Sequence, residues 1–169
     1  MIAGYCMQAT LLFMKNIKTI KVYDVRRENA EKFCERWKHL PYKFEVVDSA
    51  EAAIRDSDIV HTVTTVDVGE EYVEPSWLKK GSFHSFVSQY DYKEECHLLP
   101  NVKFGMDWLD RLNDRDSCTL ANMVLDGKMA KPTYPLVTQV SDVLLGKHPG
   151  RTNDDDICLL YTSPSPRDS

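Results

Sequence analysis

Several patterns that would identify a class of protein are missing from this sequence. Its five cysteines include no CxxC pair, and none has a histidine partner at metal-ligand spacing. It contains no long basic run and its net charge is -5 at pH 7, so a nucleic-acid partner is not indicated. The longest apolar stretch, Ala9–Met14, is far too short to cross a membrane. The first residues also lack the basic region of a secretion signal.

The remaining composition is that of an ordinary globular domain. The chain has 169 residues, of which 43% are hydrophobic and 28% charged, enough for one domain with a real core. Cys34 falls on an apolar helical face, as expected for a small core residue. Unpaired cysteines of this kind indicate a reduced, cytoplasmic setting.

Short strand patterns alternate with helical patterns along the chain. The clearest helix is Glu28–Trp37, with Ala30, Phe33, Cys34 and Trp37 at i, i+3, i+4, i+7. We predict strands at Ile2–Gly4, Ile20–Tyr23, Phe44–Val47, Ile59–Thr64, Ser82–Val87 and Val102–Gly105. This alternation predicts an α/β fold, a doubly wound parallel sheet of the Rossmann type.

Other helices are predicted from weaker signals. Gln8–Lys15 should bury Leu12 and Phe13, together with Ala9. Asp48, with Glu51 at the capping-box position, is expected to begin a short helix. The region from Trp108 to Leu145 is expected to be mainly helical.

The segment GYCMQA at Gly4–Ala9 occupies the predicted turn from the first strand into the first helix. It approximates the G-x-G-x-x-G/A pattern, in which glycine allows a tight turn and backbone N–H groups meet a pyrophosphate. Cys6 replaces the second glycine, and its Cβ takes room where the backbone must approach the phosphates. A plain structural turn is the alternative interpretation.

Asp24 follows the second strand, about 20 residues after Gly4. A carboxylate at this spacing accepts from the ribose 2′-hydroxyl and repels a 2′-phosphate, which favours NAD over NADP. Arg26 and Arg27 lie close by and could soften that preference. The alternative is a solvated strand end.

Three threonines, Thr62, Thr64 and Thr65, lie at the carboxyl end of the fourth strand. Ligands of doubly wound sheets bind beyond these ends. Threonine is equally a plain strand former. His61 is expected to be a core or interface histidine.

Taken in order, the motifs resemble the ornithine cyclodeaminase/μ-crystallin family from about Ile2 to Ile157. The matching segments are GYCMQA, VYD (Val22–Asp24), Asp48–Thr65, WLKKGS (Trp77–Ser82) and GKHPGRTNDDDI (Gly146–Ile157). The resemblance implies a Rossmann domain inserted into a second domain that handles substrate and forms a homodimer. Family members include lyases that cyclise ornithine, NAD(P)H-dependent dehydrogenases and imine reductases, and non-enzymatic binding proteins.

The resemblance also implies roles for single residues. Met7 and Gln8 would fall on the phosphate-loop contacts, in the cofactor-binding turn that also contains Gly4 and Cys6. Asp24 would fall on the ribose contact, Thr62 and Thr64 by the contacts of strand four, and Ser85 beside the nicotinamide. The catalytic Asp of the lyase members falls on Tyr90 when counted without gaps, with Asp91 next to it. Asp91 is therefore the catalytic candidate, and an exposed acidic loop residue is the alternative. Pocket-wall candidates are His84, Trp108 and Tyr134.

The resemblance also suggests how the chain divides. Residues 1–145 would form the dinucleotide-binding domain with a truncated first strand, and 146–157 a return toward a second domain. Residues 158–169 include CLLYTSPSPRD, which looks like a translated transposase-end sequencing adaptor, so we expect a non-native tail. The chain would begin about 100 residues into the family's fold, end before its last helix, and be catalytically silent alone.

Two functional interpretations within the family follow. The first is part of an NAD-dependent amino-acid or imine oxidoreductase, or a cyclodeaminase-type lyase, with a small amino acid or imine as substrate. The second is a non-catalytic dinucleotide-binding protein or regulatory subunit. An unrelated α/β domain is the third alternative. No metal, nucleic-acid or membrane partner is expected.

Overall fold

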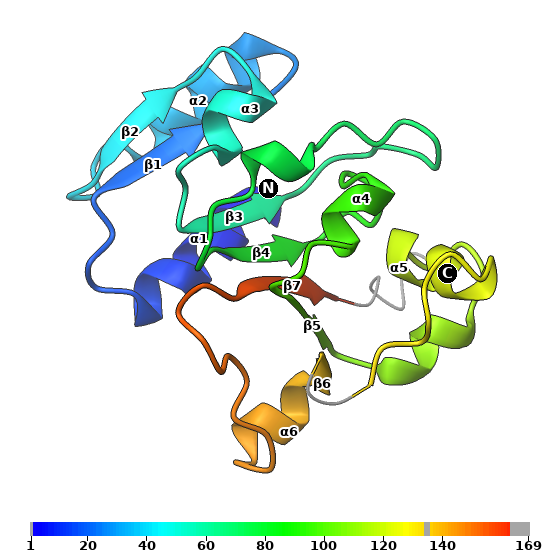
Figure 1. The fold of residues 1–169 in the computed structure, drawn as a ribbon. Coiled ribbons are helices and arrows are strands. Elements are labelled where there is room, and N and C mark those ends of the chain that lie inside the picture. The colour runs from blue at the N-terminus through cyan, green and yellow to red at the C-terminus, as the bar shows by residue number, and fades with distance from the viewer. Residues whose placement is uncertain (1, 134–135, 163–169) are drawn as a thin grey trace. The chain divides into compact units, whose positions relative to one another are not determined.

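The computed structural model describes residues 2–133 and 136–162. It contains two compact units, Met1–Arg55 and Asp56–Ser169. Figure 1 labels the helices and strands of both units.

The first unit has a two-stranded parallel sheet. β1 (Thr19–Val22) pairs with β2 (Lys43–Val46), and the register places Val22 beside Val46. The connection between them is α2 (Arg27–Trp37), as predicted from its apolar periodicity. The strands are therefore joined as a βαβ unit, with both carboxyl ends at the same edge.

The first described residues of the chain are helical. α1 covers Ile2–Phe13, so the strand predicted at Ile2–Gly4 is wrong. Gly4 is buried in α1, where an added Cβ would lie 3.2 Å from Trp37 Cζ2. The predicted inward face is also wrong, because Leu12 and Phe13 are 67% and 81% exposed. The missing Cβ of Gly4 thus lets α1 approach the Trp37 ring instead of forming a tight turn.

The last helix of the first unit begins one residue later than predicted. α3 covers Ala50–Ile54, and Ser49, not Asp48, is its N-cap. Ser49 has an extended backbone, and its hydroxyl accepts a 3.0 Å hydrogen bond from the Ala52 N–H. Glu51 pairs with Arg55 instead of completing a capping box.

The second unit has a five-stranded, entirely parallel sheet in the order β3-β4-β7-β5-β6. Its elements in chain order are β3 (Ile59–Thr62), η1 (Pro75–Trp77), β4 (Phe83–Phe86), α4 (Glu94–His97), β5 (Val102–Met106), η2 (Leu109–Asn113), α5 (Thr119–Leu125), β6 (Val137–Gln139), α6 (Val140–Leu144) and β7 (Ile157–Tyr161). β6 interrupts the region predicted to be helical. The α/β, Rossmann-type class with a parallel sheet is confirmed.

The last strand in sequence lies in the middle of this sheet. β7 is hydrogen-bonded to β4 on one side and to β5 on the other, as the red strand between two green strands of Figure 1 shows. Ile157, Leu159 and Tyr161 alternate inward and are at most 2% exposed. Residues 158–161 thus form most of a central strand, although we expected them to lie outside the fold. Thr162 follows β7 and donates its hydroxyl to the Phe86 carbonyl, and residues 163–169 of that predicted tail lie outside the described residues.

Among the described residues, no helix is long and apolar enough to cross a membrane. All five cysteines are free. Cys34, predicted to be a small core residue, is half-buried on α2.

Truncating Leu159 should destabilise the second unit strongly. Leu159→Ala leaves a cavity between two neighbouring strands, and we expect a loss of about 2–5 kcal/mol in the free energy of unfolding. The measurement is urea denaturation followed by circular dichroism. Leu144→Ala is the matched control, since Leu144 is 81% exposed and should change stability by less than about 0.5 kcal/mol. Equal effects of the two substitutions would contradict the central position of β7.

Candidate functional site

The carboxyl ends of β3 and β4 carry most of the polar residues predicted for the second unit. Thr62 ends β3, and its carbonyl accepts from the Val87 and Ser88 N–H groups that follow β4. Parallel strands present these ends at one edge, which is where ligands of α/β sheets bind.

A buried carboxylate lies at this edge. Asp91 is 1% exposed, and its carboxylate accepts hydrogen bonds from three hydroxyl groups. Thr64 Oγ1 donates over 2.5 Å and Tyr72 OH over 3.1 Å to one oxygen, while Ser88 Oγ donates to the other. The Asp91 carbonyl also accepts from the Tyr72 and Val73 N–H groups. Asp91 therefore joins the segments that follow β3 and β4.

This arrangement corrects the alternative that Asp91 is an exposed loop residue. Its three hydroxyl donors come from three separate places in the chain, and only Thr64 among them is exposed. Sequence reasoning missed Ser88 and Tyr72. Ser88 lies three residues before Asp91, a spacing that could have suggested a local side-chain contact.

Two predicted cofactor residues, Thr62 and Ser85, lie on the strands beside this cluster. Thr62 is 5% exposed, and its Oγ1 has no hydrogen-bond partner among the described residues. A buried hydroxyl in this state is unusual in a folded protein. Ser85 is half-buried on β4, opposite His61 of β3 in the register. His61, predicted to be a core or interface histidine, is half-buried, and burial lowers its pKa.

The ends of β4 and β7 are joined by a buried arginine that sequence reasoning missed. Arg111 of η2 is 3% exposed and donates to the Thr162 carbonyl, the Ser117 carbonyl and Gln89 Oε1. Tyr90, on which the lyase aspartate would fall, donates its hydroxyl to the Asp116 carbonyl. Burial is the main cause that raises the Tyr90 pKa to about 12. Tyr90 thus provides no carboxylate and no readily ionised group.

In the first unit, Asp24 lies two residues beyond the end of β1. Its Oδ1 accepts from the Arg26 N–H at 2.9 Å and from Asn29 Nδ2 at 3.1 Å. Its Oδ2 makes no hydrogen bond with any described residue. One carboxylate oxygen is thus held by the chain, and the other remains an acceptor of the kind that a ribose hydroxyl would require.

The predicted phosphate loop has a different form from the one expected. Gly4, Cys6, Met7 and Gln8 all lie within α1, where Gly4 and Met7 are buried and Gln8 is exposed. Burial raises the pKa of the Cys6 thiol. The glycine-rich turn that would cradle a pyrophosphate is absent from the described residues of this segment.

The GRTNDDDI motif lies at the other end of the sheet. Asp156 is 5% exposed and accepts from the Thr152 N–H, Thr152 Oγ1 and the Asn153 N–H at 3.0–3.2 Å. Arg151 donates to the Gly81 carbonyl at 2.7 Å. Gly81 has φ +76°, and a Cβ on it would lie 2.5 Å from the Asp154 carbonyl oxygen. Residues 151–155 are exposed, and only Asp156 of the acidic run is buried, where it holds the turn that leads into β7.

Of the pocket-wall candidates, His84 is fully buried and Trp108 is 53% exposed. Tyr134 lies outside the described residues. The Ser82 hydroxyl donates to the Lys79 carbonyl, so His84 Nε2 donates to Ser82 Oγ and His84 Nδ1 accepts from Tyr92 OH, both at 2.7 Å. His84 therefore belongs to a satisfied core network.

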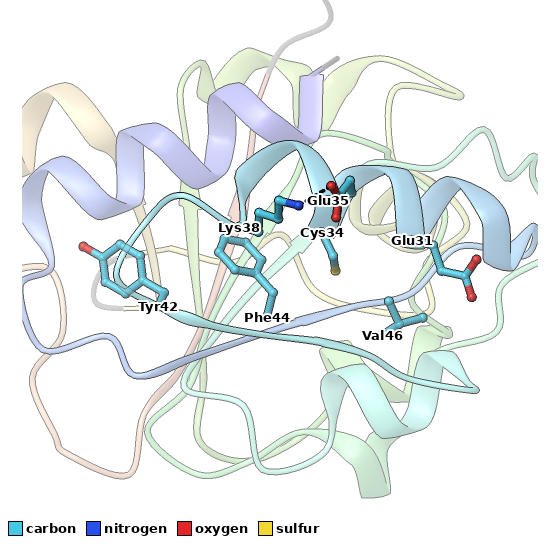
Figure 2. A pocket seen from close by; sticks show the side chains of 7 residues that line it. All are labelled: Glu31, Cys34, Glu35, Lys38, Tyr42, Phe44 and Val46. Carbon is cyan, nitrogen blue, oxygen red and sulfur yellow. Dashed lines mark hydrogen bonds and ion pairs between the residues drawn. The ribbon is translucent and has the colours of Figure 1, made fainter.

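A groove of about 350 Å³ lies on the first unit between α2 and β2, as Figure 2 shows. Its lining residues are Glu31, Cys34, Glu35, Lys38, Tyr42, Phe44 and Val46. None of the residues predicted to bind a cofactor lines this groove. Within the described residues, no group of three or more His, Cys, Asp or Glu side chains is placed to hold a metal ion.

The parallel sheet and its polar carboxyl edge define a Rossmann-like α/β protein. The Ornithine cyclodeaminase/mu-crystallin family model matches residues 4–164. The chain therefore belongs to this family, and the resemblance found in its motifs is confirmed.

One relative is the N-((2S)-2-amino-2-carboxyethyl)-L-glutamate dehydrogenase of Staphylococcus aureus (strain NCTC 8325 / PS 47), 30% identical over 156 residues. The match covers 91% of this chain and 45% of the relative.

Two solved structures show the same fold. The Thermococcus litoralis Δ1-pyrroline-2-carboxylate reductase in complex with NADH and L-proline has a TM-score of 0.78 and 22% identity, covering 95% of this chain and 49% of the reductase. An archaeal alanine dehydrogenase dimer with bound NAD has a TM-score of 0.73 and 21% identity. The match covers 96% of this chain and 49% of the dehydrogenase chain. The chain spans about half the length of the proteins it matches.

Replacing the buried carboxylate should loosen the carboxyl edge of the second unit. In the unsubstituted protein, three hydroxyl groups donate to the Asp91 carboxylate. In Asp91→Asn, the amide NH₂ cannot accept these hydrogen bonds, and we expect a loss of about 1–3 kcal/mol in the free energy of unfolding. Urea denaturation measures it. Asp67→Asn, at an exposed position before Asp91's partner Tyr72, should have little effect. A stable Asp91→Asn protein would contradict the proposed loop-joining role.

The stability of the second unit should fall in mild acid. Burial lowers the pKa values of His84 and His97 to about 4, from 6.5. The unfolded chain therefore binds more protons between pH 6.5 and 4, so the free energy of unfolding decreases as pH falls through that window. The expected loss at pH 5 is about 2 kcal/mol per histidine.

Urea midpoints at pH 7 and pH 5 test this dependence. His97→Gln should lower stability at pH 7, because His97 bonds the Lys93 carbonyl and Tyr161 OH, but it should reduce the pH dependence. His39→Gln, at an exposed histidine, should leave the pH dependence unchanged. An unchanged pH dependence in His97→Gln would show that this histidine does not stay neutral in the fold.

Proposed function

We propose that the chain binds a nicotinamide dinucleotide, NAD(H) in preference to NADP(H), as part of an oxidoreductase that acts on an amino acid or an imine. The observation that carries this proposal is the Asp24 carboxylate after β1, with one oxygen held and the other free to accept from a ribose. Membership of the family supports it. So do a dehydrogenase relative and structural neighbours with bound NADH or NAD.

In this proposal, the two ends of the dinucleotide have different requirements. Asp24 accepts from the adenosine ribose. Thr62, Thr64 and Ser85 are the candidates for the nicotinamide half, with the unpartnered Thr62 hydroxyl as a donor. Gly4, Cys6, Met7 and Gln8 would meet the phosphates only after the start of α1 rearranges into a turn. When bound, the cofactor supplies hydride transfer at an amine or imine carbon.

Asp91 is the proposed acid–base group. Its carboxylate is buried, whereas its hydrogen-bond donor Thr64 is exposed. A proton taken up by the Thr64 oxygen from substrate, with the Thr64 proton passing to Asp91, would connect the buried carboxylate to a reacting group. The same two groups would return the proton in the reverse direction.

The second candidate function is a non-catalytic dinucleotide-binding member of the family or a regulatory subunit. The observation in its favour is that all the donors around Asp91 are satisfied without a ligand and that Tyr90 stands where the lyase carboxylate would fall. Turnover of NADH with imines, or of NAD with amino acids, by the whole protein distinguishes an enzyme from a binder. We further propose that the whole protein is a cytoplasmic homodimer, supported by the archaeal alanine dehydrogenase dimer and the five free cysteines.

Replacing Asp24 should weaken NADH binding. Asp24→Asn removes the charge that attracts the ribose hydroxyls, and we expect the Kd for NADH to rise about 5- to 10-fold. Fluorescence titration of NADH measures the Kd. Glu35→Gln removes one negative charge from the same unit, at a residue paired with Lys38, and should leave the Kd unchanged. Unchanged NADH affinity in Asp24→Asn would refute Asp24 as the ribose ligand.

A further inference from the structure

The two arginines that follow Asp24 differ in their partners. The Arg26 guanidinium makes no hydrogen bond or ion pair with any described residue. The Arg27 guanidinium binds two carboxylates, with Nε 3.0 Å from Glu31 Oε1 and Nη1 in contact with Asp48 Oδ1. Arg27 is therefore the arginine whose charge is already compensated.

The direction of Arg27 follows from the parallel sheet of the first unit. Val22 of β1 lies beside Val46 of β2, and Asp24 and Asp48 each lie two residues beyond that pair. Arg27 is the first residue of α2. Its bond to Asp48 holds the guanidinium toward the end of β2, whereas the proposed ribose ligand Asp24 lies at the end of β1.

We propose that Glu31 and Asp48 are specificity-determining residues that withhold Arg27 from the ribose 2′ position. This inference rests on the proposed function, binding of a nicotinamide dinucleotide. A 2′-phosphate carries between one and two negative charges and is accommodated by a nearby arginine. Because Arg27 is held by two carboxylates, its positive charge offsets less of the repulsion between Asp24 and a 2′-phosphate than its place in the sequence suggests.

The size of the effect is limited by solvent exposure. The Arg27 and Asp48 side chains are 59% and 89% exposed, so each ion pair by itself is weak and screened by salt. Two carboxylates on one guanidinium nevertheless compete directly with a phosphate for the same donors. We therefore expect a change of a few fold in cofactor preference, largest at low ionic strength.

The experiment compares dissociation constants for NADPH and NADH by fluorescence titration of the chain at low salt. Glu31→Gln with Asp48→Asn should lower the ratio of Kd(NADPH) to Kd(NADH) about 3- to 10-fold, because Arg27 is released. The Kd for NADH should stay within about twofold. In the Arg27→Ala background, the same pair of substitutions should lower the ratio much less. Glu28→Gln with Glu35→Gln, also on α2, is the charge-matched control, and circular dichroism checks that each variant is folded.

Three other results would overturn the inference, and each has a different explanation. An equal fall of the ratio with Arg27 present and in the Arg27→Ala background, or in the charge-matched control, would assign the effect to net charge and not to Arg27. An unchanged ratio, with NADH still bound, would refute the inference and leave the proposed function standing. Failure of the unsubstituted chain to bind either nucleotide would refute both.

Discussion

The pairing of β7 with β4 and β5 is the interaction on which the second unit depends. β7 has a hydrogen-bonded strand on each side, so its backbone groups close two ladders of the sheet. The side chains of Leu159 and Tyr161 fill the core, and Tyr161 reaches both Phe86 and His97. Removal of β7 would separate β3-β4 from β5-β6 and leave edges that are short and apolar.

The hydrogen-bonded side chains at the two ends of the sheet have different structural roles. At the amino end, Asp156 and Arg151 shape the turn that leads into β7. At the carboxyl end, Asp91 joins the segments after β3 and β4, and Arg111 joins those after β4 and β7. The strands thus bring a buried carboxylate and a buried guanidinium to the edge where α/β proteins bind their ligands. The residues proposed for binding and catalysis in this unit thus lie at or near the carboxyl edge, and the residues that shape the turn into β7 lie at the amino edge.

Local patterns predicted much of this fold. β-branched runs located β1 to β5 to within two residues at each end, and apolar spacing located α2, because both signals depend on neighbours in sequence. α1 was wrong because residues 4–9 can form a helix once Gly4 packs on Trp37, a contact that local spacing does not reveal. β7 was not predicted because its composition resembled an adaptor, and only pairing with β4 and β5 makes it a strand. The burial of Asp91 depends on Tyr72 and Ser88, which no motif connects to it. Asp24 was found from spacing alone, and its role remains a proposal, as do those of the other predicted site residues.

The position of β7 also has a consequence for synthesis on the ribosome. All four of its sheet companions are translated first, and β4 and β5 must wait for residues 157–161 to emerge before their facing edges are paired. Until then, the nascent chain exposes apolar strand edges, which are prone to association. The long sequence separation between β4 and β7 also predicts slow folding of this unit, limited by closure of the sheet around its last strand.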